Sequence, residues 1–166
     1  GTAQDVSELR DSEERYRSLV ELAPDAILIV TDEVIVFANS AAVGLLGAER
    51  PQQLIGRSVE DFIHPDFVES AAQGRRRMLR DHSRAPRREQ KALRLDGSVF
   101  DIEVSATYLR WKGADSVQPI IRDITARKGV EAELLEAEEK YRGLFDHALV
   151  GLAHARISDG KPLEVN

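Results

Sequence analysis

The chain has 166 residues, enough for one ordinary domain with extensions, and its 42% hydrophobic and 31% charged residues are typical of a folded protein. It has no cysteine, which excludes disulfides, thiolate metal sites and a cysteine nucleophile. The net charge of −6 argues against a nucleic-acid partner, and no apolar run is long enough to cross a bilayer. We therefore expect a cytoplasmic protein with no membrane segment in this part of the chain.

Residues 1–22 predict an amphipathic linker helix. Apolar side chains recur on a narrow stripe at roughly heptad spacing, at Val6, Leu9, Tyr16 and Val20. Such a stripe is typical of a helix that pairs with a second chain, or of one that lies on its own domain. We expect the first arrangement, a homodimer with Leu9, Tyr16 and Val20 in its seam.

Short strands and helices alternate after this helix. The predicted elements are strands at 26–31 and 34–38, a short helix at 40–46, helical turns at 52–63, a longer helix from 65 to about 80, and strands at 87–95, 98–112 and 116–125. Turn residues such as Asp96-Gly97 separate the last three strands. The order of two strands, several helices and three strands predicts an α+β fold.

An internal repeat indicates the domain organisation. Residues 12–30 (SEERYRSLVELAPDAILIV) match residues 137–155 (AEEKYRGLFDHALVGLAHA) at a constant offset of 125 residues. The match resumes where LEVN, at 163–166, echoes VFAN, at 36–39. We therefore expect 148–166 to be the truncated start of a second domain, with strands near 150–155 and 163–166.

The segment 126–147 predicts a coiled-coil-like signalling helix. Its apolar residues are spaced four, three, four and three when Ala137 is counted between Leu134 and Tyr141, and charged residues fill most other positions. The candidate dimer seam in this helix consists of Val130, Leu134, Tyr141 and Leu144. A helix lying on its own domain is again the alternative.

Four motifs carry a resemblance to a known family. They are FANSAAVGLLG at 37–47, QLIGRSVEDFIHPDF at 53–67, LDGSVFDIEVSA at 95–106 and RDITARK at 122–128. In this order and spacing they resemble a PAS domain with its PAC motif, at 23–125, and the repeat resembles the start of a second PAS domain. The resemblance implies a five-stranded antiparallel sheet in the order 2-1-5-4-3, with helices on one face that enclose an apolar pocket.

The strand residues supply candidates for that pocket. Alternation in FDIEVSA places Ile102 and Val104 on one face and their charged neighbours on the other. The candidate pocket residues are Ile29, Thr31, Phe37, Met78, Ile102, Val104, Val117, Pro119 and Ile121. Such side chains fill a solid core as readily as they line a pocket for a small apolar metabolite, so both alternatives stay open.

The sequence does not predict the identity of a cofactor, but its residues do not suit two classes of cofactor, haem and cysteine-linked flavin. The resemblance implies that a haem-binding member would ligate iron through a histidine on the long helix, and 66–80 contains none. Photoactive flavin-binding members use a cysteine, which the chain lacks. We therefore expect neither haem nor a cysteine-linked flavin, and no metal site.

The tripeptide Asp123-Ile124-Thr125 joins the last predicted strand to the signalling helix. Asp123 is placed to accept hydrogen bonds or to pair with an arginine, Ile124 to enter the core, and Thr125 to cap the helix through its hydroxyl. The resemblance implies that this motif relays the signal from the sensor core to the output linker.

The predicted function is a sensory PAS module for signal transduction and dimerisation in a multidomain regulator. The output domain of such a regulator would be a histidine kinase, a diguanylate cyclase or a phosphodiesterase. The alternative is a stand-alone receptor for a small molecule or cofactor. The sequence contains no phosphate-binding loop, nucleophile elbow or metal-spaced histidine set, so an enzymatic function is not expected for this chain.

Overall fold

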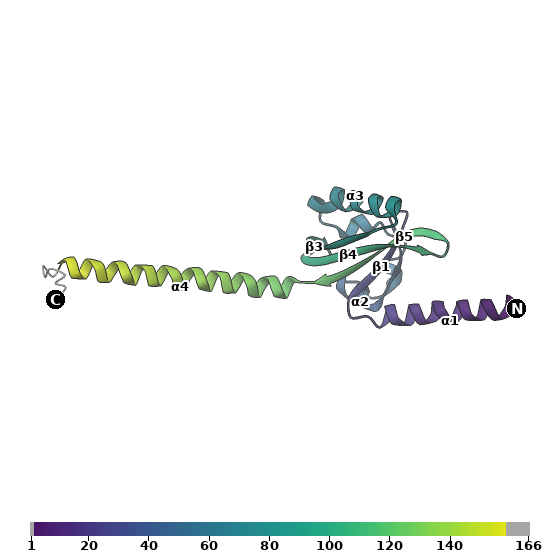
Figure 1. The fold of residues 1–166 in the computed structure, drawn as a ribbon, viewed down its shortest axis with the longest axis horizontal. Helices are drawn as coiled ribbons and strands as arrows, with labels where there is room; N and C mark the ends of the chain where they lie inside the picture. Colours follow the sequence, from purple (N-terminus) through teal and green to yellow (C-terminus); the bar gives the residue numbers. More distant parts are fainter. Residues whose placement is uncertain (1, 159–166) are drawn as a thin grey trace. The chain divides into compact units, whose positions relative to one another are not determined.

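Five antiparallel strands form one sheet in the order β2-β1-β5-β4-β3 in the computed structural model, which describes residues 2–158 (Figure 1). The strands are β1 (Ala26–Thr31), β2 (Val34–Ala38), β3 (Arg84–Leu93), β4 (Val99–Trp111) and β5 (Ala114–Asp123). This sheet, with helices around it, confirms the predicted fold class and strand order.

The helices begin at residues that suit helix starts. They are α1 (Thr2–Glu21), α2 (Ser40–Leu45), the 3₁₀ turns η1 (Pro51–Gln53) and η2 (Val59–Phe62), α3 (Pro65–Asp81) and α4 (Thr125–Ser158). Asn39 caps α2, because its side-chain oxygen accepts the Ala42 N–H at 2.9 Å. Pro65 occupies the first turn of α3, where its missing N–H costs nothing.

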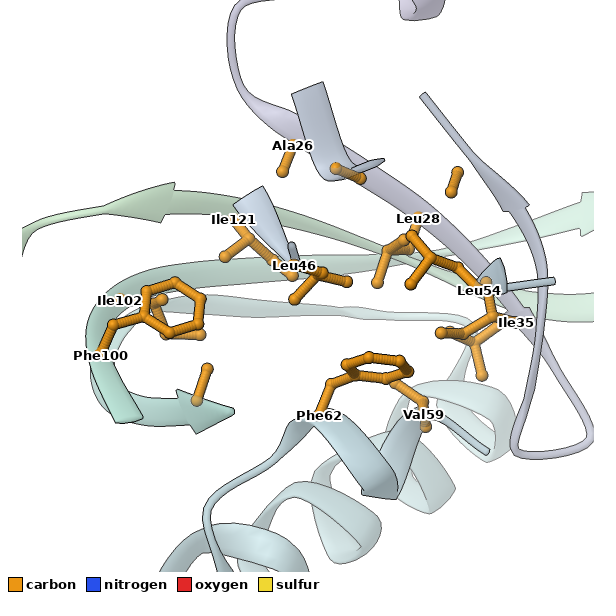
Figure 2. Packing of buried hydrophobic residues seen from close by; sticks show 14 residues of the cluster. Ala26, Leu28, Ile35, Leu46, Leu54, Val59, Phe62, Phe100, Ile102 and Ile121 are labelled. Atoms are coloured by element: carbon orange, nitrogen blue, oxygen red, sulfur yellow. The ribbon is translucent and has the colours of Figure 1, made fainter. Parts of the chain in front are cut away.

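One face of the sheet and the short helices enclose the hydrophobic core. Leu28 of β1, Leu46 after α2, Phe62 of η2 and Ile102 of β4 point into the same space (Figure 2). Each is at most 5% exposed, and burying a side chain of this size contributes about 1.5–3 kcal/mol. Helix α3 covers the same face (Figure 1), so the space between α3 and the sheet is where a ligand cavity can form.

The opposite face of the sheet carries aromatic residues that contact α1. The Trp111 ring centroid lies 5.6 Å from that of Phe37 and 6.3 Å from that of Tyr16. Burial raises the pKa of the Tyr16 hydroxyl, although a hydrogen bond with Gln118 opposes this shift. Tyr16 therefore belongs in part to an intramolecular contact.

Helix α4 belongs to a separate unit that begins at Ala126. It continues through 150–155, so the strand predicted there is wrong. A helix satisfies its own backbone hydrogen bonds, whereas a strand needs a paired neighbour. The strand predicted at 163–166 lies outside the described residues, and the start of a second PAS domain stays a prediction. No helix within 2–158 has the length and apolar character that a bilayer crossing requires.

Candidate functional site

A cavity of about 90 Å³ lies between α3 and the inner face of the sheet. Strands β3, β4 and β5 form one wall, α3 forms another, and Leu28, Leu46 and Phe62 close it from the core side. Most of the lining is apolar. The cavity is therefore an extension of the core in which side chains leave room for a small molecule.

Six of the nine predicted pocket residues line this cavity. They are Met78, Ile102, Val104, Val117, Pro119 and Ile121. Two cross-strand pairs bring three of them together, since Val104 lies opposite Ile121 and Ala106 opposite Pro119 in the β4–β5 register. The alternation in β4 and β5 thus places these side chains as the sequence predicts.

Ile29, Thr31 and Phe37 do not line the cavity, so the predicted register of β1 was off by one residue. Ile29 is fully buried and pairs with Phe37, whose ring contacts Trp111. The Thr31 hydroxyl lies 2.7 Å from the Ser116 hydroxyl. Residues 26–30 are all buried, so β1 shows no alternation of apolar and polar residues from which to read its register.

One part of the cavity wall is polar. Arg88 and Gln90 are alternate residues of β3, opposite Val104 and Ile102 of β4, and Arg75 reaches the cavity from α3. An Arg75 terminal nitrogen, Nη2, pairs with Glu33 and lies 3.1 Å from Glu60 Oε1. Sequence reasoning missed all three lining residues, because they lie in the basic run 75–91 (RRRMLRDHSRAPRREQK), whose charges favour a solvated surface. Their spacing on an amphipathic helix and an alternating strand was the available signal.

The lining residues include no histidine that could ligate haem iron. Within 2–158, no three or more histidine or carboxylate side chains are grouped so that they could hold a metal ion. A dry cavity of about 150 Å³ accommodates benzene, so a cavity of 90 Å³ does not take a porphyrin or a flavin ring without rearrangement. The expectation of neither cofactor stays a prediction.

The predicted relay residues form a connected junction. Asp123 Oδ1 accepts the Thr125 N–H at 2.8 Å, and Ile124 is 2% exposed. The Thr125 hydroxyl accepts the Asp101 N–H of β4 at 3.2 Å. The cap of α4 by this hydroxyl stays a prediction, while the Asp123 carboxylate accepts the first amide of the helix.

Arg94 connects this junction with the core, and sequence reasoning missed it. Its Nη2 lies 3.3 Å from Asp123 Oδ2, and its Nε donates to the Leu45 carbonyl at 3.2 Å. Its guanidinium carbon lies 4.0 Å from the Phe100 ring centroid. Arg94 follows β3, 29 positions before Asp123, so no local pattern indicates the pair.

The predicted seam residues differ in exposure. Val130, Leu134, Tyr141 and Leu144 of α4 are 59–74% exposed, and Leu9 of α1 is 63% exposed. Val20 is 6% exposed, so its assignment to a seam is wrong. The Asn39 amide donates to the Val20 carbonyl at 2.8 Å, which ties the end of α1 to the domain.

Comparisons with known proteins agree with this geometry. The PAS fold family model matches residues 14–124. Sporulation kinase A of Bacillus subtilis (strain 168) is 29% identical over 151 residues, which cover 91% of this chain and 24% of the kinase. Sporulation kinase E of the same organism is 31% identical over 162 residues, which cover 94% and 21%. The crystal structure of a PAS domain from Colwellia psychrerythraea superposes with a TM-score of 0.60 at 21% identity, over 68% of this chain and 97% of that domain.

These relatives fix the class of the domain and its general role. The alignment with sporulation kinase A is longer than the span 14–124, so the similarity includes part of the flanking helices. The chain spans about a quarter of the curated relatives that it matches. PAS domains are sensory modules and not catalysts, and homology to segments of these kinases supports a sensory role in signal transduction. The chain belongs to the PAS fold family.

Proposed function

We propose that this chain is the sensory input of a longer signalling protein, in which a small molecule in the α3 cavity acts on α4 through the Asp123-Ile124-Thr125 junction. The protein works as a homodimer, and α4 leads toward an output domain. The names of the relatives favour a kinase over a cyclase or phosphodiesterase as that output. The cavity is the site where the signal enters.

The observation that carries this proposal is the course of β5. Val117, Pro119 and Ile121 of this strand line the cavity, and the strand ends at Asp123. Only Ile124 separates it from α4. A ligand that shifts β5 along or away from the sheet therefore moves the first residues of α4 directly.

Arg94 supplies a second connection between the core and the junction. It holds the Asp123 carboxylate while its guanidinium stacks on Phe100, a core residue of β4. Displacement of β4 by a ligand would move this arginine and change the bond that it makes to Asp123. We expect the ligand to change the junction between two arrangements, with the Arg94–Asp123 bond formed or broken, because a relay needs such a two-state element.

A cavity-filling variant tests the coupling. Ala106→Leu places an alkyl group in the cavity from β4 and stands in for a ligand. We expect hydrogen exchange in the first turns of α4 to change by about twofold or more, and Asp123→Ala to abolish this response. Asp96→Ala is the control for the loss of a turn bond, because Asp96 also accepts an amide two residues on, from Ser98 at 2.8 Å, in the turn that follows Arg94.

The coupling proposal fails if a folded Ala106→Leu variant leaves exchange in α4 unchanged. It also fails if Asp96→Ala abolishes the response as Asp123→Ala does, because any loss of a turn bond would then have the same effect. Circular dichroism of each variant first establishes that the domain is folded.

Dimerisation is tested separately on α4. Leu134 lies on the seam and Leu135 beside it, and both are exposed, by 59% and 58%. If the seam is the interface, Leu134→Lys weakens the dimer by about tenfold or more, because a charge replaces a buried apolar contact. Leu135→Lys is the matched control and leaves it nearly unchanged. Sedimentation equilibrium measures both, and a wild-type chain that stays monomeric refutes the homodimer.

A further inference from the structure

The polar wall of the cavity is incomplete. Arg75 and Gln90 are 7% and 8% exposed, and both line the cavity. Within the part of the chain that the structure describes, Arg75 Nε and Gln90 Oε1 are buried without a hydrogen-bond partner. A buried donor and a buried acceptor left without partners are costly, so each indicates a group that the cavity is built to receive.

Arg88 adds a positive charge to this wall, although part of its side chain is exposed to solvent. It forms no ion pair with any residue among 2–158, whereas the charge of Arg75 is balanced by Glu33 and Glu60. Partial burial, and then repulsion by Arg75, lower the pKa of the Arg88 guanidinium. An anion between these two arginines would offset this repulsion.

We propose that the cavity binds a short-chain hydroxycarboxylate, with the carboxylate against Arg88 and Arg75 Nε and the hydroxyl donating to Gln90 Oε1. The alkyl part then lies against the apolar wall that Ile102 and Val104 form. This inference rests on the proposed sensory function and names the chemical class of its ligand. Each of the three polar groups on the wall receives the kind of partner that it lacks.

The size of the cavity limits the ligand. A volume of 90 Å³ is smaller than the roughly 150 Å³ of a cavity that takes benzene, so it limits the ligand to about three or four carbons. Larger fatty acids and aromatic acids do not fit without displacement of α3 or the sheet. Selectivity for short chains is therefore part of the proposal.

Calorimetric titration of the full chain with four probes tests each part of this assignment. L-lactate carries every proposed group, lactamide replaces the charge, propionate lacks the hydroxyl, and hexanoate exceeds the cavity. We expect lactate to bind, and lactamide and hexanoate to bind at least about tenfold more weakly. Propionate should bind several-fold more weakly than lactate, because Gln90 Oε1 then stays without a donor.

Two substitutions locate the anion. Arg88→Gln should weaken lactate by about tenfold or more, because a neutral amide replaces a charged donor. Arg77→Gln, the same change at an exposed position on α3 outside the cavity lining, should leave the affinity unchanged. Equal loss in both variants would mean that lactate responds only to the net charge of the chain, which overturns the assignment.

The remaining outcomes separate this inference from the proposed function. If lactamide binds as well as lactate, or if only neutral probes bind, the cavity is a ligand site but the hydroxycarboxylate is wrong. Equal binding of propionate overturns the role of Gln90. If no probe binds, the hydroxycarboxylate is again refuted, while the response of α4 to Ala106→Leu still decides whether cavity and junction are coupled.

Discussion

Asn39 makes four hydrogen bonds, three of them fully buried, that join three parts of the domain, and its removal should destabilise the fold severely. It accepts the N–H groups of Ile27 and Ala42, each at 2.9 Å, and donates to the carbonyls of Val20 at 2.8 Å and Asp25 at 3.0 Å. A typical internal hydrogen bond contributes about 1 kcal/mol net, so Asn39→Ala should lower the free energy of unfolding by about 4 kcal/mol. That is a large share of the roughly 5–15 kcal/mol of a whole domain.

Urea denaturation followed by circular dichroism measures this loss. Trp111 is the only tryptophan and its ring contacts Tyr16 of α1, so its fluorescence also reports whether the end of α1 is released. Gln52→Ala, an exposed amide on η1, is the control and should change stability by less than about 0.5 kcal/mol. A loss below about 1 kcal/mol for Asn39→Ala, with an unchanged urea slope, would refute the additive hydrogen-bond reasoning.

Three further outcomes are expected. Ile102→Asp buries an unpaired carboxylate on β4 and should lower the free energy of unfolding, measured by denaturation, by several kcal/mol. Val99→Asp on the same strand should lower it much less, because Val99 is 49% exposed. The reverse order would show that the register of β4 is wrong. The hydrogen bond from Arg122 holds the pKa of the Asp25 carboxyl below its usual value. The ionised carboxylate therefore stabilises the fold above about pH 4, and this stabilisation is lost as the pH falls through the folded-state pKa. The stability difference between the wild type and Asp25→Asn should therefore shrink below about pH 4, and a constant difference would contradict this. The absorbance spectrum of the purified chain should contain no haem Soret band and no light-reversible flavin bands. Either signal would contradict the expectation that the chain binds neither haem nor a photoactive flavin.

The sequence predicted the sheet and the part of the cavity wall that β4 and β5 form, because each of these strands has one apolar face. Alternation in β4 identifies Ile102 and Val104 correctly, and the same period in β5 identifies Val117 and Ile121. Strand β1 has no such alternation, because the core packs on one face and Trp111 with its neighbours packs on the other. A strand buried on both faces cannot be assigned to one side from its own residues.

Long-range polar contacts were the other part that local patterns could not predict. Arg94 bonds Asp123, and Thr125 bonds Asp101, across 29 and 24 positions of the chain. The predicted pairing of Asp123 with an arginine was correct. Its partner depends on which strands become neighbours, and that is decided by the whole sheet.

The internal repeat predicts two roles for the exposed face of α4, if the proposed dimer forms. At an offset of 125 residues, Leu144 corresponds to Leu19 and Phe145 to Val20. Leu19 is 73% exposed, whereas Val20 is buried against the domain that follows α1. If α1 and α4 contact the domains that follow them in the same way, Leu144 belongs to the dimer seam and Phe145 contacts the next domain.

Adjacent substitutions on α4 test this division. Leu144→Lys should weaken the dimer by about tenfold or more, while Phe145→Lys should leave it nearly unchanged, although both residues are more than half exposed. Sedimentation equilibrium of both variants, at one salt concentration to hold charge screening constant, measures the difference. If Phe145→Lys weakens the dimer as much as Leu144→Lys does, the interface covers a wider face of α4 than the heptad seam. The correspondence between Phe145 and Val20 would then carry no structural meaning, because an interface residue in the dimer cannot also serve as the contact that Val20 makes within its own domain.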